Sequence, residues 1–321
     1  AVISPDNRSV GFVAENDLYI ADMQNGGAVR RLTTDGKRNH IINGATDWVY
    51  EEEFAFTRAF AFSPDGAKVA YLRFDESEVE EFEMMRYDAQ LYNRPYKFKY
   101  PKAGERNSTV ELYVYDIATG ARTKVDVGDE SDQYIPRIGW TPRGELYFFR
   151  ENRLQNHFEV LLASADGASR VIYDERSPRY VERVDDRTVT FLADGDRFVV
   201  RNETESGYMH LYLYSASRGR LRALTEGAWE VTEVVEVTDE RVYYLSTETS
   251  PLRRNLYSVK LNGRDKRRIT ERDGMYRIAP SRGMRYYISY FSSADDPQTV
   301  TLHRADGELV RVLEDNSDYV K

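Results

Sequence analysis

Short runs of alternating apolar and polar residues recur along the chain, and each is followed by a glycine-containing turn and a second short run. Such alternation is typical of half-buried β-strands, and two runs joined by a tight turn form a hairpin. The predicted first strands are 18–22, 112–116, 159–163, 211–214, 256–259 and 300–303. The predicted second strands are 30–33, 122–125, 170–173, 222–225, 267–270 and 311–313. The turns between them contain Asn25-Gly26, Thr119-Gly120, Asp166-Gly167, Arg218-Gly219, Asn262-Gly263 and Asp306-Gly307.

A second kind of turn precedes several of these hairpins. It reads Ser63-Pro64-Asp65-Gly66, with variants at 4–7 and 141–144, and it joins two further strands. Four short strands repeated about every 45–51 residues are the pattern of β-propeller blades, which bury their faces on one another. The sequence therefore predicts an all-β propeller of four-stranded antiparallel blades. Six blades are expected, at about 1–33, 55–127, 134–173, 180–225, 231–270 and 276–314.

The first predicted blade is short, because only Ala1-Val2-Ile3 precede its first turn. We therefore expect residues 1–321 to be a propeller fragment. Two segments interrupt the repeat, at about 34–54 and 75–108. The second contains closely spaced glutamates and then methionine and aromatic residues. We interpret it as a hairpin arm with a partner-binding surface, and the alternative is a mobile solvated loop.

The first interrupting segment contains Thr46-Asp47-Trp48-Val49-Tyr50-Glu51-Glu52-Glu53-Phe54, which predicts a short helix. Asp47 (or Thr46) can cap its start, and the carboxylates are expected in the first two turns, where the helix dipole favours negative charge. Because successive helical side chains fan out by about 100°, only an adjacent pair of acids can converge on one compact cation, such as a free amino group. A glutamate run is usually a solvated face or a set of partners for Lys and Arg. The aromatic flanks instead favour partial burial of the acids.

Composition excludes several classes of function. The net charge of −9, from 54 acidic and 45 basic residues, argues against binding to a nucleic-acid backbone. The absence of cysteine excludes disulfides, thiolate metal sites and cysteine nucleophiles. The chain has no G-x-S-x-G elbow, phosphate loop or dinucleotide fingerprint, and its four histidines are not at metal-ligand spacing. We therefore expect no cofactor, no metal and no catalytic residues in this fragment.

The glutamate motif and four other stretches resemble the dipeptidyl peptidase IV family. They appear in family order and cover nearly the whole chain: residues 43–53, 100–104 (Tyr-Pro-Lys-Ala-Gly), 229–231 (Trp-Glu-Val), 254–257 (Arg-Asn-Leu-Tyr) and 312–317 (Val-Leu-Glu-Asp-Asn-Ser). The resemblance implies six blades of an eight-bladed propeller that is joined to a C-terminal α/β-hydrolase domain. It also implies a serine exopeptidase that releases X-Pro or X-Ala dipeptides from free peptide N-termini.

By the same resemblance, Glu52 and Glu53 hold the substrate α-ammonium and Glu51 turns away. Asp47, Trp48, Tyr50 and Glu51 are expected to support the motif. The segment resembling 75–108 is an arm used in homodimers. The catalytic triad belongs to the hydrolase domain, so this fragment is expected to be inactive alone.

Two other functions stay open. The chain could be a non-catalytic propeller scaffold that binds protein partners, or part of a sibling prolyl tripeptidyl peptidase. The lack of cysteine departs from disulfide-bearing extracellular relatives and suggests a bacterial protein in the periplasm or at the cell surface.

Overall fold

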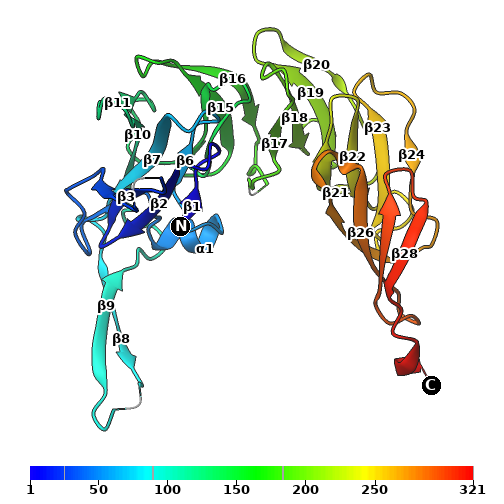
Figure 1. The fold of residues 1–321 in the computed structure, drawn as a ribbon, viewed down its shortest axis with the longest axis horizontal. Helices are drawn as coiled ribbons and strands as arrows, with labels where there is room; N and C mark the ends of the chain where they lie inside the picture. The colour runs from blue at the N-terminus through cyan, green and yellow to red at the C-terminus, as the bar shows by residue number, and fades with distance from the viewer. Residues whose placement is uncertain (25, 89, 183, 321) are drawn as a thin grey trace. The chain divides into compact units, whose positions relative to one another are not determined.

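The computed structural model describes residues 1–24, 26–88, 90–182 and 184–320, so Asn25 of the first predicted turn lies outside the described residues. The described chain is almost entirely β-structure and separates into two compact units, Ala1–Asp185 and Asp186–Lys321. Each unit contains three blade sheets of antiparallel strands, and the first unit also contains a separate two-stranded sheet (Figure 1). The predicted propeller blades are therefore confirmed as the architecture of this chain.

The first unit contains blades one to three. Blade one consists of β1 (Val2–Ile3), β2 (Ser9–Ala14), β3 (Asp17–Asp22) and β4 (Val29–Arg31). Blade two consists of β5 (Ile41–Asn43), β6 (Phe60–Phe62), β7 (Lys68–Asp75), β10 (Thr109–Asp116) and β11 (Arg122–Val125). Blade three consists of β12 (Gln133–Tyr134), β13 (Ile138–Trp140), β14 (Leu146–Asn152), β15 (His157–Ala163) and β16 (Ser169–Arg176).

The second unit contains blades four to six. Blade four consists of β17 (Val189–Phe191), β18 (Arg197–Asn202), β19 (His210–Ser215) and β20 (Gly219–Ala223). Blade five consists of β21 (Val231–Val237), β22 (Arg241–Ser246), β23 (Asn255–Lys260) and β24 (Arg267–Arg268). Blade six consists of β25 (Met275–Pro280), β26 (Tyr286–Ser292), β27 (Thr299–Arg304) and β28 (Leu309–Glu314). Two 3₁₀ helices, η1 (Arg282–Met284) and η2 (Ser317–Val320), complete this unit.

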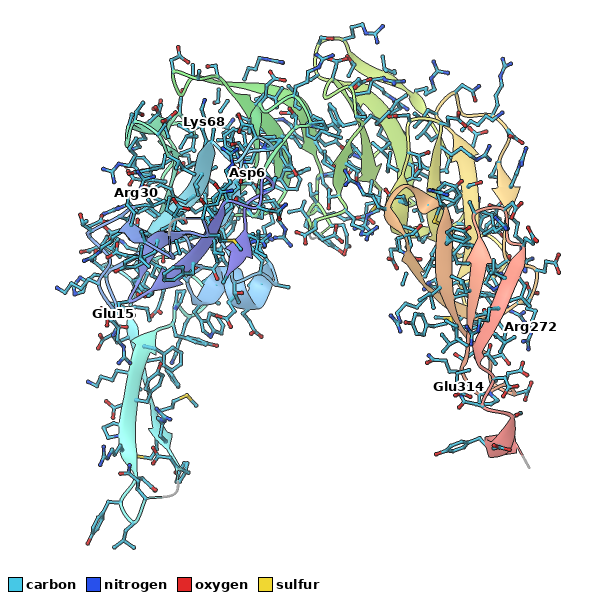
Figure 2. All side chains as sticks on the ribbon, in the orientation of Figure 1. Asp6, Glu15, Arg30, Lys68, Arg272 and Glu314 are labelled. Carbon is cyan, nitrogen blue, oxygen red and sulfur yellow. The ribbon has the colours of Figure 1, made fainter. Side chains whose placement is uncertain are left out.

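Hydrophobic side chains from neighbouring blades pack together inside each unit. In the first unit, Leu18 and Ile20 of blade one contact a cluster that includes Phe60 and Tyr71 of blade two. In the second unit, a similar cluster joins the sheets of blades four and five. Neighbouring blades within a unit therefore bury side chains on one another, as blades of a propeller do. Figure 2 shows all side chains on the ribbon.

Blade two differs from the prediction in one respect. Ile41–Asn43 and Phe60–Phe62 both pair with β7, at residues 73–75 and 69–71 respectively. One edge of the sheet is thus built from two short strands, and the only α-helix among the described residues, α1 (Trp48–Glu53), lies between them in sequence. The expectation that blade two begins at residue 55 is wrong, because a three-residue strand is too short to show an alternating pattern.

Segment 75–108 forms a hairpin that extends away from blade two (Figure 1). Its strands, β8 (Glu81–Arg86) and β9 (Arg94–Lys99), pair antiparallel from Glu81 opposite Lys99 to Arg86 opposite Arg94. Large apolar side chains are exposed along it, including Met84, Tyr87, Leu91 and Tyr92. Its use as a partner-binding surface stays a prediction.

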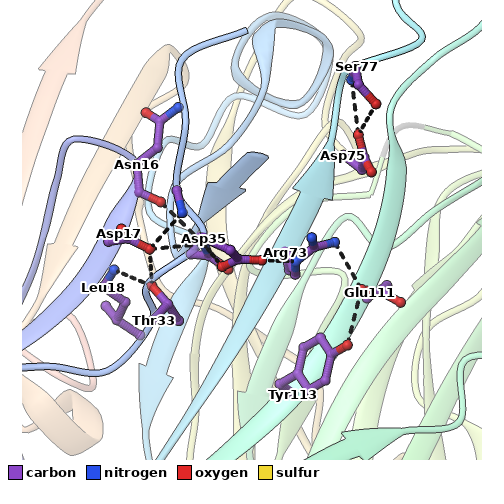
Figure 3. A network of polar contacts seen from close by, with 12 residues as sticks. Asn16, Asp17, Leu18, Thr33, Asp35, Arg73, Asp75, Ser77, Glu111 and Tyr113 are labelled. Atoms are coloured by element: carbon purple, nitrogen blue, oxygen red, sulfur yellow. Dashed lines mark hydrogen bonds and ion pairs between the residues drawn. The ribbon is translucent and has the colours of Figure 1, made fainter. Parts of the chain in front are cut away.

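A polar network with a buried centre at Asp17 joins blade one to the root of the helical segment (Figure 3). The carboxylate of Asp17, which is fully buried, accepts hydrogen bonds from Thr33 Oγ1 (2.6 Å) and Asn43 Nδ2 (3.2 Å). Asp35 accepts from Asn43 Nδ2 (2.9 Å) and from Arg73 Nε (2.8 Å). Asn43 ends β5, so this network fixes the point at which the chain leaves the sheet toward α1. No helix among the described residues has both the length and the apolar character needed to cross a membrane.

Candidate functional site

Asp47 starts α1 as its N-cap, as predicted. Its backbone is extended and its Oδ1 accepts a hydrogen bond from the Tyr50 N–H at 3.0 Å, which satisfies one of the orphan donors of the first turn. Its Oδ2 accepts a second hydrogen bond from Ser108 Oγ at 2.6 Å. Burial raises the pKa of Asp47, and the hydrogen bonds from Ser108 and Tyr50 oppose that shift because they favour the ionised form.

Two aromatic residues fix the buried side of the helix. Tyr50 is 2% exposed, and its hydroxyl oxygen accepts a hydrogen bond from the Ile135 N–H of blade three at 2.8 Å. Its ring lies 4.7 Å from the ring of Phe74, measured between centroids. The ring of Trp48 lies 4.0 Å from that of Tyr100, which follows the arm hairpin. The predicted support residues therefore pack α1 against blade two, blade three and the base of the arm.

Glu51, Glu52 and Glu53 are all exposed, so the expectation that they are partly buried is wrong. The buried aromatic side chains, Tyr50 and Phe54, pack on the inner side of the helix, and the three glutamates lie on its outer side. The helix also ends at Glu53, so Glu52 and Glu53 lie in its last turn and only Glu51 reaches the first. The prediction that the helix dipole stabilises the carboxylates is therefore wrong for Glu52 and Glu53, because the C-terminal end of a helix favours cations.

Arg137 of blade three lies against the end of the helix. Its Nη2 donates to the carbonyl oxygen of Phe54 at 3.0 Å, and its Nη1 donates to the Pro136 carbonyl at 2.6 Å. Its guanidinium carbon lies 4.7 Å from the centre of the Phe56 ring. Arg137 and Ser108 are not among the predicted site residues, because each lies more than 50 residues from its partner on the helical segment. No local pattern signals contacts at that separation.

Glu76, at the end of β7, is a second buried acid near the N-terminal end of α1. Burial and the nearby charge of Asp47 raise the pKa of Glu76 to about 7, and Lys99 opposes this shift. Lys99 Nζ also donates to the carbonyl of Val79 at 2.6 Å. The charge of Lys99 at the base of the arm and the charge of Asp47 at the cap of α1 therefore both act on Glu76.

One group of described residues has the composition of a metal site. Nε2 of His157 lies 2.8 Å from Asp174 Oδ2 and 3.6 Å from Glu159 Oε1 on β15 and β16. Arg150 and Arg176 already contact these two carboxylates, at 2.7 Å and 3.3 Å. Because the two guanidinium groups neutralise both carboxylates, we interpret the group as an ion-pair network.

Comparison with known proteins finds relatives that match nearly the whole chain. The family model described as the dipeptidyl peptidase IV (DPP IV) N-terminal region matches residues 1–298. Dipeptidyl peptidase 4 of Trichophyton rubrum is 31% identical over 89% of this chain and 39% of its own length. Dipeptidyl peptidase 4 of Sus scrofa is 30% identical over 98% of this chain and 44% of its own length. The chain thus spans less than half of these relatives.

Two solved structures are similar. The crystal structure of Porphyromonas gingivalis dipeptidyl peptidase 4 superposes with a TM-score of 0.93 at 38% identity, over 98% of this chain and 45% of that one. A putative dipeptidyl aminopeptidase IV from Bacteroides ovatus gives a TM-score of 0.82 at 24% identity, over 97% of this chain and 45% of that one. The second likeness shows the shared fold alone.

Proposed function

This chain belongs to the dipeptidyl peptidase IV family, and we propose that it is the substrate-selecting propeller region of a serine exopeptidase. In this proposal the parent protein releases X-Pro or X-Ala dipeptides from free peptide N-termini, and Glu52 and Glu53 bind the substrate α-ammonium. A C-terminal α/β-hydrolase domain of the same chain supplies the catalytic triad, so residues 1–321 alone are inactive.

The observation that carries the proposal is the position of the acids on α1. Glu52 and Glu53 are exposed at the C-terminal end of a helix whose last turn contains no basic residue. The two adjacent carboxylates attract a cation to this point, and Arg137 compensates the helix dipole there. An ammonium group with three N–H donors can form charge-assisted hydrogen bonds with two carboxylates.

This arrangement would determine where along the peptide the cleavage occurs. When the ammonium is fixed, the number of residues between it and the nucleophile determines which peptide bond is cleaved. An acetylated N-terminus has no positive charge to pair with the acids, so it is bound less well than a free one. The proposed function is therefore selection by the charge at the end of the substrate.

The test is kinetic and uses the full-length parent protein. We expect rapid release of a reporter from Gly-Pro-reporter and almost none from its acetylated form. Glu52→Gln and Glu53→Gln should each lower kcat/KM roughly 30- to 5,000-fold, which corresponds to about 2–5 kcal/mol, by analogy with the loss of one partner from a charge pair that becomes buried when the peptide binds. Glu51→Gln is the matched control and should have a smaller effect. Equal, small effects at all three positions would contradict the assignment of the acids.

The other functions predict different results. A non-catalytic scaffold cleaves neither substrate, and a tripeptidyl peptidase releases tripeptides, which product analysis by mass spectrometry detects. We further propose that the arm at 75–108 contributes to a homodimer. Its exposed apolar side chains support this, because such surfaces are typical of protein interfaces. We also propose that the parent protein lies in the periplasm or at the cell surface of a bacterium, because residues 1–321 lack the cysteines of disulfide-bearing extracellular relatives.

A further inference from the structure

The glutamate-bearing helix is too short to hold its own direction. It has six residues, and isolated helices shorter than about 12–15 residues are marginal in water. Contacts from outside must therefore decide where Glu52 and Glu53 point. Asp47 and Ser108 fix the N-terminal end. The other end needs an anchor too, because the last carbonyl groups of a helix have no partner within it.

Arg137 supplies that anchor from another blade. Its hydrogen bond to the carbonyl of Phe54, the C-cap residue, brings a positive charge to the negative end of the helix dipole. The helix sequence itself provides no basic residue there. The same guanidinium stacks on Phe56, two residues further along.

The residue between these two contacts makes the anchor necessary. Ala55 has a φ of 55°, in the left-handed region, which costs a non-glycine residue about 1–2 kcal/mol. Such a conformation persists only where surrounding contacts hold it. Arg137 contacts the chain on both sides of Ala55 and so fixes the turn in which α1 ends.

A second contact comes from the same short segment of blade three. The Ile135 N–H binds the Tyr50 hydroxyl in the middle of α1, and Arg137 binds its end. Residues 135–137 thus hold the helix at two points about one turn apart. We propose that Arg137 is a positioning residue, which orients Glu52 and Glu53 toward the substrate ammonium by fixing the C-terminal end of α1.

This inference rests on the proposed function and makes a separate kinetic prediction. In the full-length protein, Arg137→Met keeps a side chain that can pack on Phe56 and removes the donors. We expect KM for Gly-Pro-reporter to rise about 10- to 100-fold, the effect of losing one charged hydrogen bond, with a much smaller change in kcat.

Two further variants separate geometry from charge. Arg137→Lys keeps the positive charge and can reach one carbonyl, so it should recover part of the lost affinity. Arg143→Met removes an exposed arginine from the turn between β13 and β14 and should behave as the unmodified protein. A global loss of stability would lower the melting temperature of Arg137→Met below that of Arg143→Met, which thermal unfolding detects.

Hydrogen exchange provides a readout that does not depend on activity. Amide protons of residues 50–56 should exchange faster in Arg137→Met than in Arg143→Met. Unchanged amide exchange in Arg137→Met would overturn the proposal. Faster exchange with an unchanged KM would also overturn it, provided that Glu52→Gln does impair cleavage. If Glu52→Gln and Glu53→Gln are themselves without effect, the proposed function is wrong. If they impair cleavage and Arg137→Met does not, only the role of Arg137 is wrong.

Discussion

Glu151 illustrates how one residue can set the response of the fold to pH. It lies on β14 with 0% of its surface exposed. Burial raises the pKa of Glu151 from 4.5 to about 8, and Gln155 opposes only part of this shift. At neutral pH the carboxyl group of Glu151 is therefore protonated in the folded chain, whereas it is ionised in the unfolded chain.

The sign of the resulting stability change follows from the protons bound. Between about pH 4.5 and pH 8 the folded chain keeps the proton of Glu151 and the unfolded chain releases it. Stability must fall with rising pH in this interval, by about 1.4 kcal/mol per pH unit from this group. Glu151→Gln abolishes the titration, so its melting temperature should match that of the parent protein at pH 5 and exceed it at pH 8.

The control for this prediction is Glu145→Gln, because Glu145 is an exposed glutamate that immediately precedes β14. In Glu145→Gln the difference in melting temperature between pH 5 and pH 8 should be the same as in the parent protein. A Glu151→Gln variant with the same pH dependence as the parent protein would contradict the assignment of Glu151 as a buried, neutral acid.

At the scale of elements, α1 depends on its cap. Asp47→Ala removes the acceptor for the Tyr50 N–H and the partner of Ser108 and should destabilise the helix by about 1–2 kcal/mol. Asp47→Asn keeps an oxygen that can cap the helix, and it removes the charge that helps to raise the pKa of Glu76. We expect faster amide exchange across 48–54 in the alanine variant than in the asparagine variant. Equal exchange in the two would mean that Asp47 acts through its charge and not through the cap.

The elements differ in how far the sequence predicts them. The hairpins and the capped helix were predictable, because strand alternation, glycine turns and an N-cap are local signals. The split edge of blade two was not, because β5 and β6 are recognisable only by their common partner, β7. The glutamates were identified, but their exposure was not, because it depends on where Trp48 and Tyr50 pack. The contacts of Arg137 and Ser108 join segments far apart in sequence and became visible only in the folded chain.

At the scale of the molecule, blades approach one another through glycines in their outer hairpin turns. A Cβ atom added to Gly167 of blade three would lie 2.2 Å from the Lys124 carbonyl oxygen of blade two. One added to Gly307 of blade six would lie 2.8 Å from the Ile269 carbonyl oxygen, next to blade five. The Gly167 carbonyl oxygen also accepts a hydrogen bond from the Asp126 N–H at 2.8 Å. The turn glycines thus allow backbone-to-backbone contact between neighbouring blades within each unit.

Gly283 allows this packing effect to be separated from backbone strain. It lies in the turn between β25 and β26 of blade six with a φ of 71°, and nothing lies within 4 Å of its added Cβ. Gly283→Ala should therefore cost only the left-handed conformation, about 1–2 kcal/mol. Gly167→Ala and Gly307→Ala should lower the melting temperature further, because a carbonyl of a neighbouring strand cannot move aside without disturbing its sheet, and overpacking adds about 1–3 kcal/mol. If thermal unfolding gives the same melting temperature for all three variants, the glycines serve their own turns and the contacts between blades do not require them.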